Sequence, residues 1–164
     1  MLTNSLTLNA IIDLISDFIE PFVGRCEAAQ ANRVPMGTGD FALLSPLRFT
    51  RHTTTKEVEG GLTEVRQLDL QVDIYGENAG DRAVALETVW RSHYATENLD
   101  GRINPLYSTD SIRVPFVDES RQWLDRYTLT ISAQVHIIVP IISDKFNKLD
   151  ITLEQVGKND NTFK

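Results

Sequence analysis

The sequence predicts an α+β fold in which two helices pack on one face of a mainly antiparallel sheet. Several segments alternate apolar and polar residues with period two, which is typical of strands that bury one face. Two further segments repeat apolar residues at helical spacing, and the predicted order of elements is α-β-β-α-β-β. The chain has 164 residues, a formal net charge of −7 and one cysteine. This composition indicates one ordinary globular domain and excludes a disulfide scaffold or a disordered chain.

The first helix is expected over residues 7–20, where apolar side chains recur at spacings of three and four and acidic side chains occupy the opposite side. Thr7 or Ser5 can cap its N-terminus, and Pro21 is expected to stop it. Residues 23–40 contain several Gly and Pro residues without any period, which predicts a loop or short irregular strands.

The main strands are expected where the alternation is strongest: residues 41–50, 62–75, 122–139 and 149–156. A shorter strand can form at residues 112–117. The second helix is expected over residues 79–95, between the second and third main strands, and a loop is expected over residues 96–111. Residues 1–156 are expected to form one domain, followed by a loose polar tail at residues 157–164.

The alternation also predicts which strand side chains are buried. The even-numbered residues from Leu68 to Ile74 and the odd-numbered residues from Trp123 to Val135 are expected to be buried together. In the first strand, one apolar face is expected to hold four residues: Phe41, Leu43, Leu47 and Phe49. Ser45 and Pro46 interrupt that strand and predict an edge position or a bulge.

The two longest predicted strands are longer than a compact domain of this size is wide. Residues 62–75 would span about 46 Å at ~3.3 Å per residue, whereas a domain of this length is only about 40 Å across. These strands must therefore bend or project, and a projecting strand offers an unpaired edge to another copy of the chain. The polar, threonine-rich segment over residues 51–61, which ends in two glycines, is expected to be the tip of a long projecting hairpin.

This tip is the first predicted interface between copies. Its mixed charges suit a head-to-tail contact and come from four residues: Arg51, Lys56, Glu57 and Glu59. A mobile surface loop is the alternative. The second predicted interface is the apolar cluster at residues 137–142, which includes Ile138 and Ile141, because both faces of the chain become apolar there and the second face needs a cover.

The sequence predicts no catalytic, cofactor or metal site. Cys26 has no histidine near it in sequence to act as a base, so a partly buried structural thiol is expected. The histidines are scattered without metal-ligand spacing: His52, His93 and His136. Asp69 and Asp73 share one strand face, with Glu64 close in sequence, and paired carboxylates can bind a cation or transfer protons. Their alternation with glutamines instead favours a solvated or lumen-facing polar face.

The charge of the chain argues against nucleic-acid binding, and its hydropathy excludes a membrane-spanning segment. An acidic chain is poorly suited to hold nucleic acid, whose phosphates require a basic surface. The longest apolar run is far too short to span a membrane, and the first residues lack the basic start of a signal peptide. The expected compartment is therefore a reducing cytosol.

A series of short segments runs in order along nearly the whole chain: Asp17-Phe18-Ile19 with Pro21-Phe22, Asn32-Arg33-Val34-Pro35, residues 71–83, Pro105-Leu106-Tyr107, Arg126-Tyr127-Thr128-Leu129 and residues 149–156. These segments resemble the phage neck or tail terminator proteins of tailed bacteriophages. The resemblance implies a structural virion protein, not an enzyme, that needs no cofactor. It also implies assembly in the host cytoplasm into a hexameric ring on the end of the tail tube, where the ring stops tube polymerisation and meets the head-completion proteins.

In such a ring, DNA is expected to pass through without specific binding, since an acidic ring repels phosphate rather than holding it. Other functions stay open from the residues alone. One is another phage connector, such as a head-completion or tail-tube protein. Another is a small cytosolic ligand-binding or enzymatic α+β domain that uses Asp69, Asp73 and His136. A nucleic-acid module with the same order of elements is a further alternative, against which the charge argues.

Overall fold

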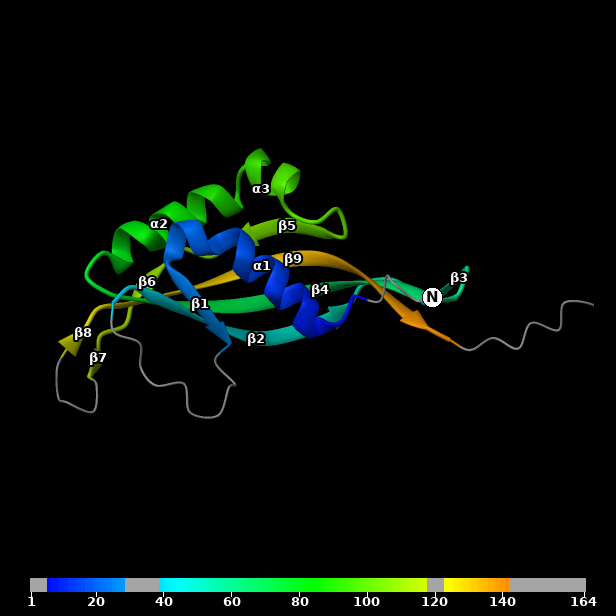
Figure 1. Cartoon of the computed structure of the whole chain (residues 1–164), viewed down its shortest axis with the longest axis horizontal. Coiled ribbons are helices and arrows are strands. Elements are labelled where there is room, and N and C mark those ends of the chain that lie inside the picture. The colour runs from blue at the N-terminus through cyan, green and yellow to red at the C-terminus, as the bar shows by residue number, and fades with distance from the viewer. Residues whose placement is uncertain (1–5, 29–38, 118–122, 142–164) are drawn as a thin grey trace, which may run out of the picture.

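The computed structural model describes residues 6–28, 39–117 and 123–141 (Figure 1). The helices are α1 (Leu8–Val23), α2 (Ala79–Trp90) and α3 (His93–Asn98). The strands are β1 (Arg25–Ala28), β2 (Phe41–Arg51), β3 (Lys56–Val58), β4 (Gly61–Tyr75), β5 (Ile103–Ser108), β6 (Ile112–Arg113), β7 (Phe116–Val117), β8 (Trp123–Leu124) and β9 (Arg126–Pro140). A seven-stranded sheet has the path β1-β2-β4-β9-β5, with β3 beside β4 and β6 beside β9, while β7 and β8 form a separate pair.

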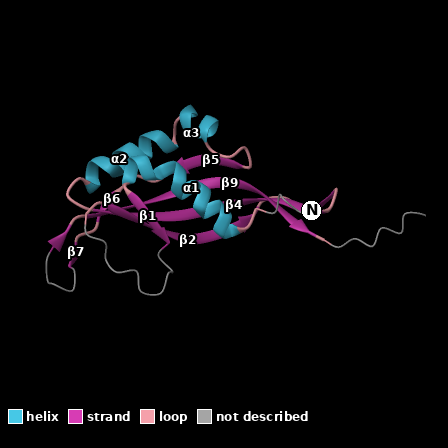
Figure 2. Cartoon of the chain, in the orientation of Figure 1, coloured by secondary structure: helices cyan, strands magenta, loops and turns pink. Residues whose placement is uncertain are grey.

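The fold class predicted from the sequence is confirmed. Every described pairing is antiparallel except that of β1 with β2. Helices α1 and α2 lie on one face of the sheet, and no described helix covers the other face, which is called the open face below (Figure 2). The predicted order of elements is incomplete, because it left out α3 and several short strands.

The core lies between the two main helices and the centre of the sheet. Its fully buried members from the helices include Ile11, Ile15, Ile19, Leu86 and Trp90, and those from β4 and β9 include Leu68, Leu70, Val72, Ile74, Leu129, Ile131, Ala133 and Val135. The predicted burial of the even positions of β4 and the odd positions of β9 is thereby confirmed. Trp123 is the exception, because it belongs to the separate strand β8 and is 75% exposed.

Helix α1 begins as predicted but ends later. The hydroxyl oxygen of Thr7 accepts a hydrogen bond from the backbone N–H of Ala10 (3.2 Å), so Thr7 is the N-cap. Pro21 does not stop the helix, which continues to Val23. The proline lies in the last turn at an exposed position, where the loss of one hydrogen bond is tolerated. The helix ends instead at Gly24, whose φ of 90° favours glycine.

The prediction that Phe41, Leu43, Leu47 and Phe49 share one face of β2 is wrong for Phe49. Ala42 and Leu44 face the core, whereas Phe41 and Leu43 lie on the open face, where the ring of Phe41 stacks on Tyr75 with centroids 4.7 Å apart. A bulge between Pro46 and Arg48 then shifts the register, so that Phe49 packs against the core and Leu47 is 56% exposed. The bulge was predicted. Proline is accepted because β1 pairs with β2 only as far as Leu44, and no described strand pairs with that side of β2 at Pro46.

Other boundaries differ from the prediction for local reasons. The predicted loop over residues 96–111 contains β5, in which a bulge between Pro105 and Tyr107 obscures the alternation. The predicted second helix is divided into α2 and α3, and the predicted strand over residues 122–139 is divided into β8 and β9. The expected strand at residues 149–156 and tail at residues 157–164 lie outside the described residues.

Strands β4 and β9 pair along 15 residues of each, from Gly61 opposite Pro140 to Tyr75 opposite Arg126. Their outer ends continue past the helices with β3 alongside, as the right side of Figure 1 shows. The arm is defined here as residues 51–65 and 136–141. The predicted projection of these long strands is therefore confirmed.

Candidate assembly surfaces

The tip of the arm is a polar hairpin with apolar side chains around it. All residues from His52 to Gly60 are exposed, and Gly60, with φ of 82°, closes the turn between β3 and β4. The arm also exposes three larger apolar side chains: Val58 (41%), Val139 (53%) and Ile141 (38%). Exposed apolar side chains on both faces of a thin projection are compatible with a surface that another protein covers.

The predicted interface residues all lie in the arm. Arg51, Lys56, Glu57 and Glu59 are exposed, Ile141 is exposed and Ile138 is half-buried. In the parts of the chain that the structure describes, these four charged side chains form no ion pair, whereas Glu64 of the same arm is paired with Arg66. Hydrogen bonding from Arg66 lowers the pKa of Glu64, so this carboxylate stays ionised and its charge is balanced within the chain.

The strands divide the arm into two faces. Lys56, Thr63 and Ile138 are cross-strand neighbours on the side continuous with the open face. Glu57 and Val139 share the other side, with Leu62 between them. Beyond Val135, β9 is paired by a described strand only on its β4 side, so the other edge of the arm has backbone groups that no described strand uses.

The open face near the middle of the sheet is polar, and its carboxylates are buried rather than solvated as predicted. Asp69 is 4% exposed and Asp73 is 8% exposed. Both lie on the face opposite the helices, but Glu64 lies on the other face, so the three acids do not form one cluster. The face is polar, as predicted, but the two carboxylates are not solvated, because neighbouring polar side chains of β2, β4 and β9 cover them.

Asp69 accepts hydrogen bonds from three side chains. The Oγ of Ser132 donates to Oδ1 (2.6 Å), Nε2 of Gln67 donates to Oδ1 (2.8 Å) and Nε of Arg48 donates to Oδ2 (2.9 Å). Burial by itself raises the pKa of Asp69, but the hydrogen bonds from Gln67, Ser132 and Arg48 outweigh it and hold the pKa below its ordinary value. A depression of about 450 Å³ beside this group is lined by Arg48, Asp69 and Tyr107, among others.

The carboxylate of Asp73 is likewise bound by neighbouring side chains of its own chain. It accepts hydrogen bonds from Oγ1 of Thr128 (2.6 Å) and from Nε2 of Gln71 (2.9 Å). His136 lies four rows along the β4–β9 ladder from Asp69, too far to act with it. The alternative of a ligand-binding or catalytic domain that uses Asp69, Asp73 and His136 therefore has no common site in this structure.

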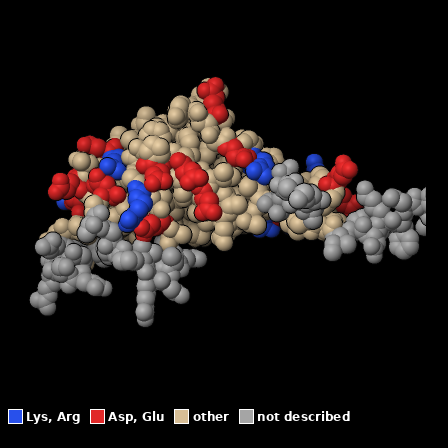
Figure 3. Space-filling model, in the orientation of Figure 1, with Lys and Arg blue, Asp and Glu red and all other residues tan. Residues whose placement is uncertain are grey.

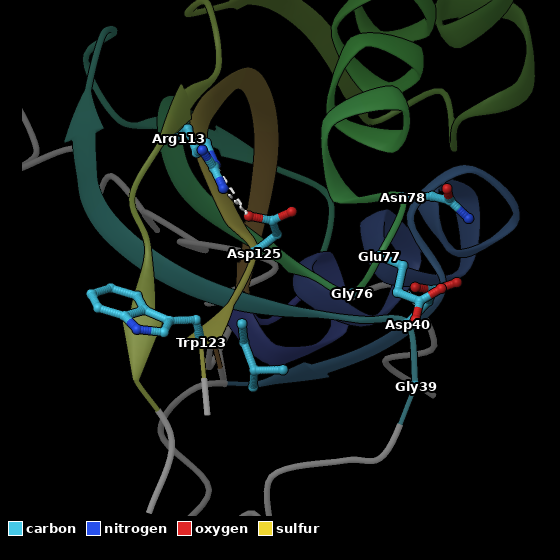
Figure 4. Close-up of a pocket in the computed structure, with 9 residues that line it drawn as sticks. Gly39, Asp40, Gly76, Glu77, Asn78, Arg113, Trp123 and Asp125 are labelled. Carbon is cyan, nitrogen blue, oxygen red and sulfur yellow. Dashed lines mark hydrogen bonds and ion pairs between the residues drawn. The ribbon is translucent and has the colours of Figure 1, made fainter. Parts of the chain in front are cut away.

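A hollow of about 740 Å³ lies at the end of the sheet opposite the arm (Figure 4). It is called the Trp123 hollow here, and it is lined by Gly39, Asp40, Gly76, Glu77, Asn78, Arg113, Trp123, Leu124 and Asp125. On one side Arg113 donates to Asp125 (2.6 Å), which ties β6 to the turn before β9. On the other side Asp40, which lines the hollow, accepts from Arg82 of α2 (2.7 Å). Two ion pairs therefore hold its walls.

Sequence reasoning did not find this hollow. The tight turn that builds it lies within residues 71–83, the segment that carried the family resemblance. Gly76 has φ of 128°, and a Cβ at this position would lie 2.0 Å from Oδ1 of Asp40. Gly80 packs against the ring of Tyr127, with atoms only 3.1 Å from the place of a Cβ. The two glycines indicate a tight turn in the sequence, but the residues they pack against, Asp40 and Tyr127, are distant in the chain, so the hollow could not be predicted.

Cys26, His93 and His136 lie in different elements of the fold. Cys26 is half-buried; burial, with the nearby carboxylates of Glu20 and Asp17, raises its pKa to about 12, which disfavours the thiolate. His52 lies on the arm and His93 pairs with Glu97 on α3. Within residues 6–28, 39–117 and 123–141, no three His, Cys, Asp or Glu side chains form a group able to hold a metal ion. Over the same ranges, no helix has the length and apolar character that crossing a membrane requires.

Two comparisons with known proteins bear on these surfaces. A family model described as "Phage neck terminator protein" matches residues 9–158. This match covers most of the chain, including the arm, the open face and the residues that line the Trp123 hollow. No curated protein matches the chain.

Proposed function

The chain belongs to the phage neck terminator protein family, and from this premise we propose that it forms a ring at the end of the phage tail tube, where it stops tube polymerisation and joins the tail to the neck and head. The coarser role is that of a structural protein of the phage neck. The finer role requires a chain that binds copies of itself as well as other virion proteins.

The projecting arm is the observation that supports this function most. It combines exposed apolar side chains, charged side chains without an ion-pair partner in the described residues, and a strand edge with which no described strand pairs. The arm of one copy would contact a different surface on the next copy. Such head-to-tail contacts close into rings when the rotation between copies allows it. A hexamer is the expected closed form.

The proposed partners follow from the position of such a ring. One face meets the tail tube protein and the other meets the head-completion or neck proteins, so the protein resides in the virion after assembly in the host cytoplasm. DNA passes through the ring without specific binding, since a chain with a formal charge of −7 repels phosphate. The exposed side chains of the arm, including Lys56 and Ile141, are the proposed contacts between copies.

Electron microscopy of the purified protein, alone and mixed with tail tubes, tests the function directly. We expect rings whose diameter matches the tube and which occupy its end. Rings that bind purified heads but never tubes would instead indicate a head-completion connector. A protein that stays monomeric and binds neither tail tubes nor heads would contradict the proposal.

A pair of substitutions tests the arm in the same assay. Val58→Asp combined with Val139→Asp places charges on both faces of the arm, and we expect rings and capped tubes to be lost because the apolar contact is lost. The matched control is Val84→Asp on α2, since Val84 is 57% exposed but lies away from the arm. The control is expected to assemble normally. Equal behaviour of the two variants would show that the arm is not the interface.

A further inference from the structure

We propose that the Trp123 hollow of one copy receives the arm of the neighbouring copy, a contact that rests on the ring proposed above. The arm and the hollow lie at opposite ends of the long axis of the molecule, as Figure 1 shows with β3 at one end and β7 and β8 at the other. A copy therefore cannot fill its own hollow with its own arm. A second copy can, and each added copy again offers a free arm or a free hollow until the ring closes.

Exposed apolar side chains mark both ends. At the hollow, Trp123 is 75% exposed, and its cross-strand neighbour Val117 is 43% exposed. At the arm, the exposed fractions of Val58 (41%) and Val139 (53%) are close to that of Val117. Tryptophan is the residue type that most often dominates binding energy at protein interfaces, and it does so when a partner covers it. An exposed tryptophan beside a hollow thus fits a surface that another chain completes.

One charged side chain at each end can form a pair across the proposed contact, Lys56 on the arm and Glu77 at the hollow. Asp40 and Asp125 are already paired with arginines of their own chain. Glu77 is exposed at the hollow and forms no ion pair within the described part of the chain. On the arm, Lys56 is likewise exposed and without such a pair, and it lies two residues from Val58 on the same side of β3. Placing Val58 against Trp123 brings an unpaired cation toward an unpaired carboxylate, which favours one register of docking.

Both partners are built before they meet. The ion pairs Asp40–Arg82 and Arg113–Asp125 hold the walls of the hollow, and Figure 4 shows Trp123 on one side of it with Glu77 and Asp40 on the other. The arm is held by its ladder of β3, β4 and β9. Because neither surface must be ordered on contact, less binding energy is lost to conformational entropy.

Cross-linking between two different variants tests the contact. In a Cys26→Ser background, Val58→Cys puts a thiol on the arm of one population and Asn78→Cys puts a thiol at the hollow of the other. Asn78 is exposed and its side chain makes no capping hydrogen bond, so the change leaves α2 intact. A short bismaleimide added to the mixture is expected to join the two variants. The control replaces Asn78→Cys with Val84→Cys, on α2 but outside the hollow.

We expect at least a fivefold higher yield of cross-linked dimer for the Val58–Asn78 mixture than for the control mixture. Rings in the microscope with a control-level yield would overturn the docking but leave the proposed function intact. A protein that is monomeric by sedimentation, with and without tail tubes, and gives no cross-link would overturn both.

A charge exchange tests the register. Lys56→Glu alone is expected to lower the cross-link yield roughly two- to fivefold at low salt, the size of one exposed ion pair. Combining Lys56→Glu with Glu77→Lys is expected to restore the yield. A full yield with Lys56→Glu alone, or a double variant as weak as the single variant, would overturn the pairing of these two residues.

Discussion

At the scale of single residues, Asp69 shows how the open face of the sheet is stabilised. A carboxylate with 4% of its surface exposed normally destabilises a fold unless it is paired and hydrogen-bonded. Here Arg48 supplies the charge, and Gln67 and Ser132 supply two further donors. The side chain links β2, β4 and β9 across the face that no described helix covers. Such a layer fixes the register of the strands without an apolar cover.

Replacing Asp69 tests this layer. Asp69→Ala leaves the hydroxyl of Ser132, which is fully buried, without its acceptor, and we expect the free energy of unfolding to fall by about 1–3 kcal/mol. Asp69→Asn keeps one oxygen as an acceptor and is expected to lose less. Urea denaturation with a cooperative probe measures both. An alanine variant as stable as the original chain would show that the layer contributes nothing.

At the scale of elements, the turn before α2 and the first turn of α2 make the specific contacts that fix the position of this helix. Gly76, Gly80 and Arg82 each meet a specific partner: Asp40 lies against the first, Tyr127 against the second, and Asp40 again pairs with the third. The turn therefore ties α2 to the start of β2 and to β9. This accounts in physical terms for the glycines and the arginine in residues 71–83.

Gly76→Ala is the matching test at this scale. The alanine would have to adopt φ of 128° and place its Cβ against Oδ1 of Asp40, so we expect a loss of about 1–3 kcal/mol or more in the free energy of unfolding. Gly101→Ala is the control, because nothing lies within 4 Å of its Cβ position, and it is expected to be close to neutral. Thermal melting of both variants gives the comparison. Equal melting temperatures would contradict the strain argument.

The elements also show what a sequence can and cannot predict here. Strands β4 and β9 and helix α1 were predictable because their alternation and helical spacing run for many residues without interruption. The buried face of β2 and the existence of β5 were not, since a bulge in each shifts the period by one residue. The arm followed from strand length and a polar tip. The Trp123 hollow did not, because its walls come from four separate segments that meet only in the fold.

At the scale of the whole molecule, acidic side chains are spread over the helix-bearing surface, as Figure 3 shows, with fewer basic ones among them. Some of these acids are tied into specific pairs. Asp100 accepts hydrogen bonds from the side chain and backbone of Arg102, which lower its pKa to about 2. The pKa of Asp69 is also below its ordinary value. Both carboxylates are thus more acidic in the folded chain than in the unfolded chain.

The fold is therefore expected to lose stability in acid. A carboxyl group whose pKa is lowered by folding stabilises the fold above its unfolded pKa, near 4, and this contribution disappears as the pH falls through the folded value. We expect a melting temperature that is nearly constant from pH 7 to pH 5 and then falls between about pH 4 and pH 2. Asp100→Asn is expected to give a shallower fall over that window, measured by thermal scans in matched buffers. An unchanged slope in this variant would contradict the assignment.

The long pairing of β4 with β9 also determines how the arm bears tension. Ladder hydrogen bonds run across the strands, so a pull along the arm loads many of its rows in shear at once, whereas a sideways pull would peel them apart singly. The same strand that ends at the tip continues through Leu68, Leu70 and Val72 into the fully buried centre of the sheet. A lengthwise force on the arm is thus borne by the interior of the subunit and not by a flexible connection. In the ring proposed above, the arm would thus act as a mechanical tether between neighbouring copies.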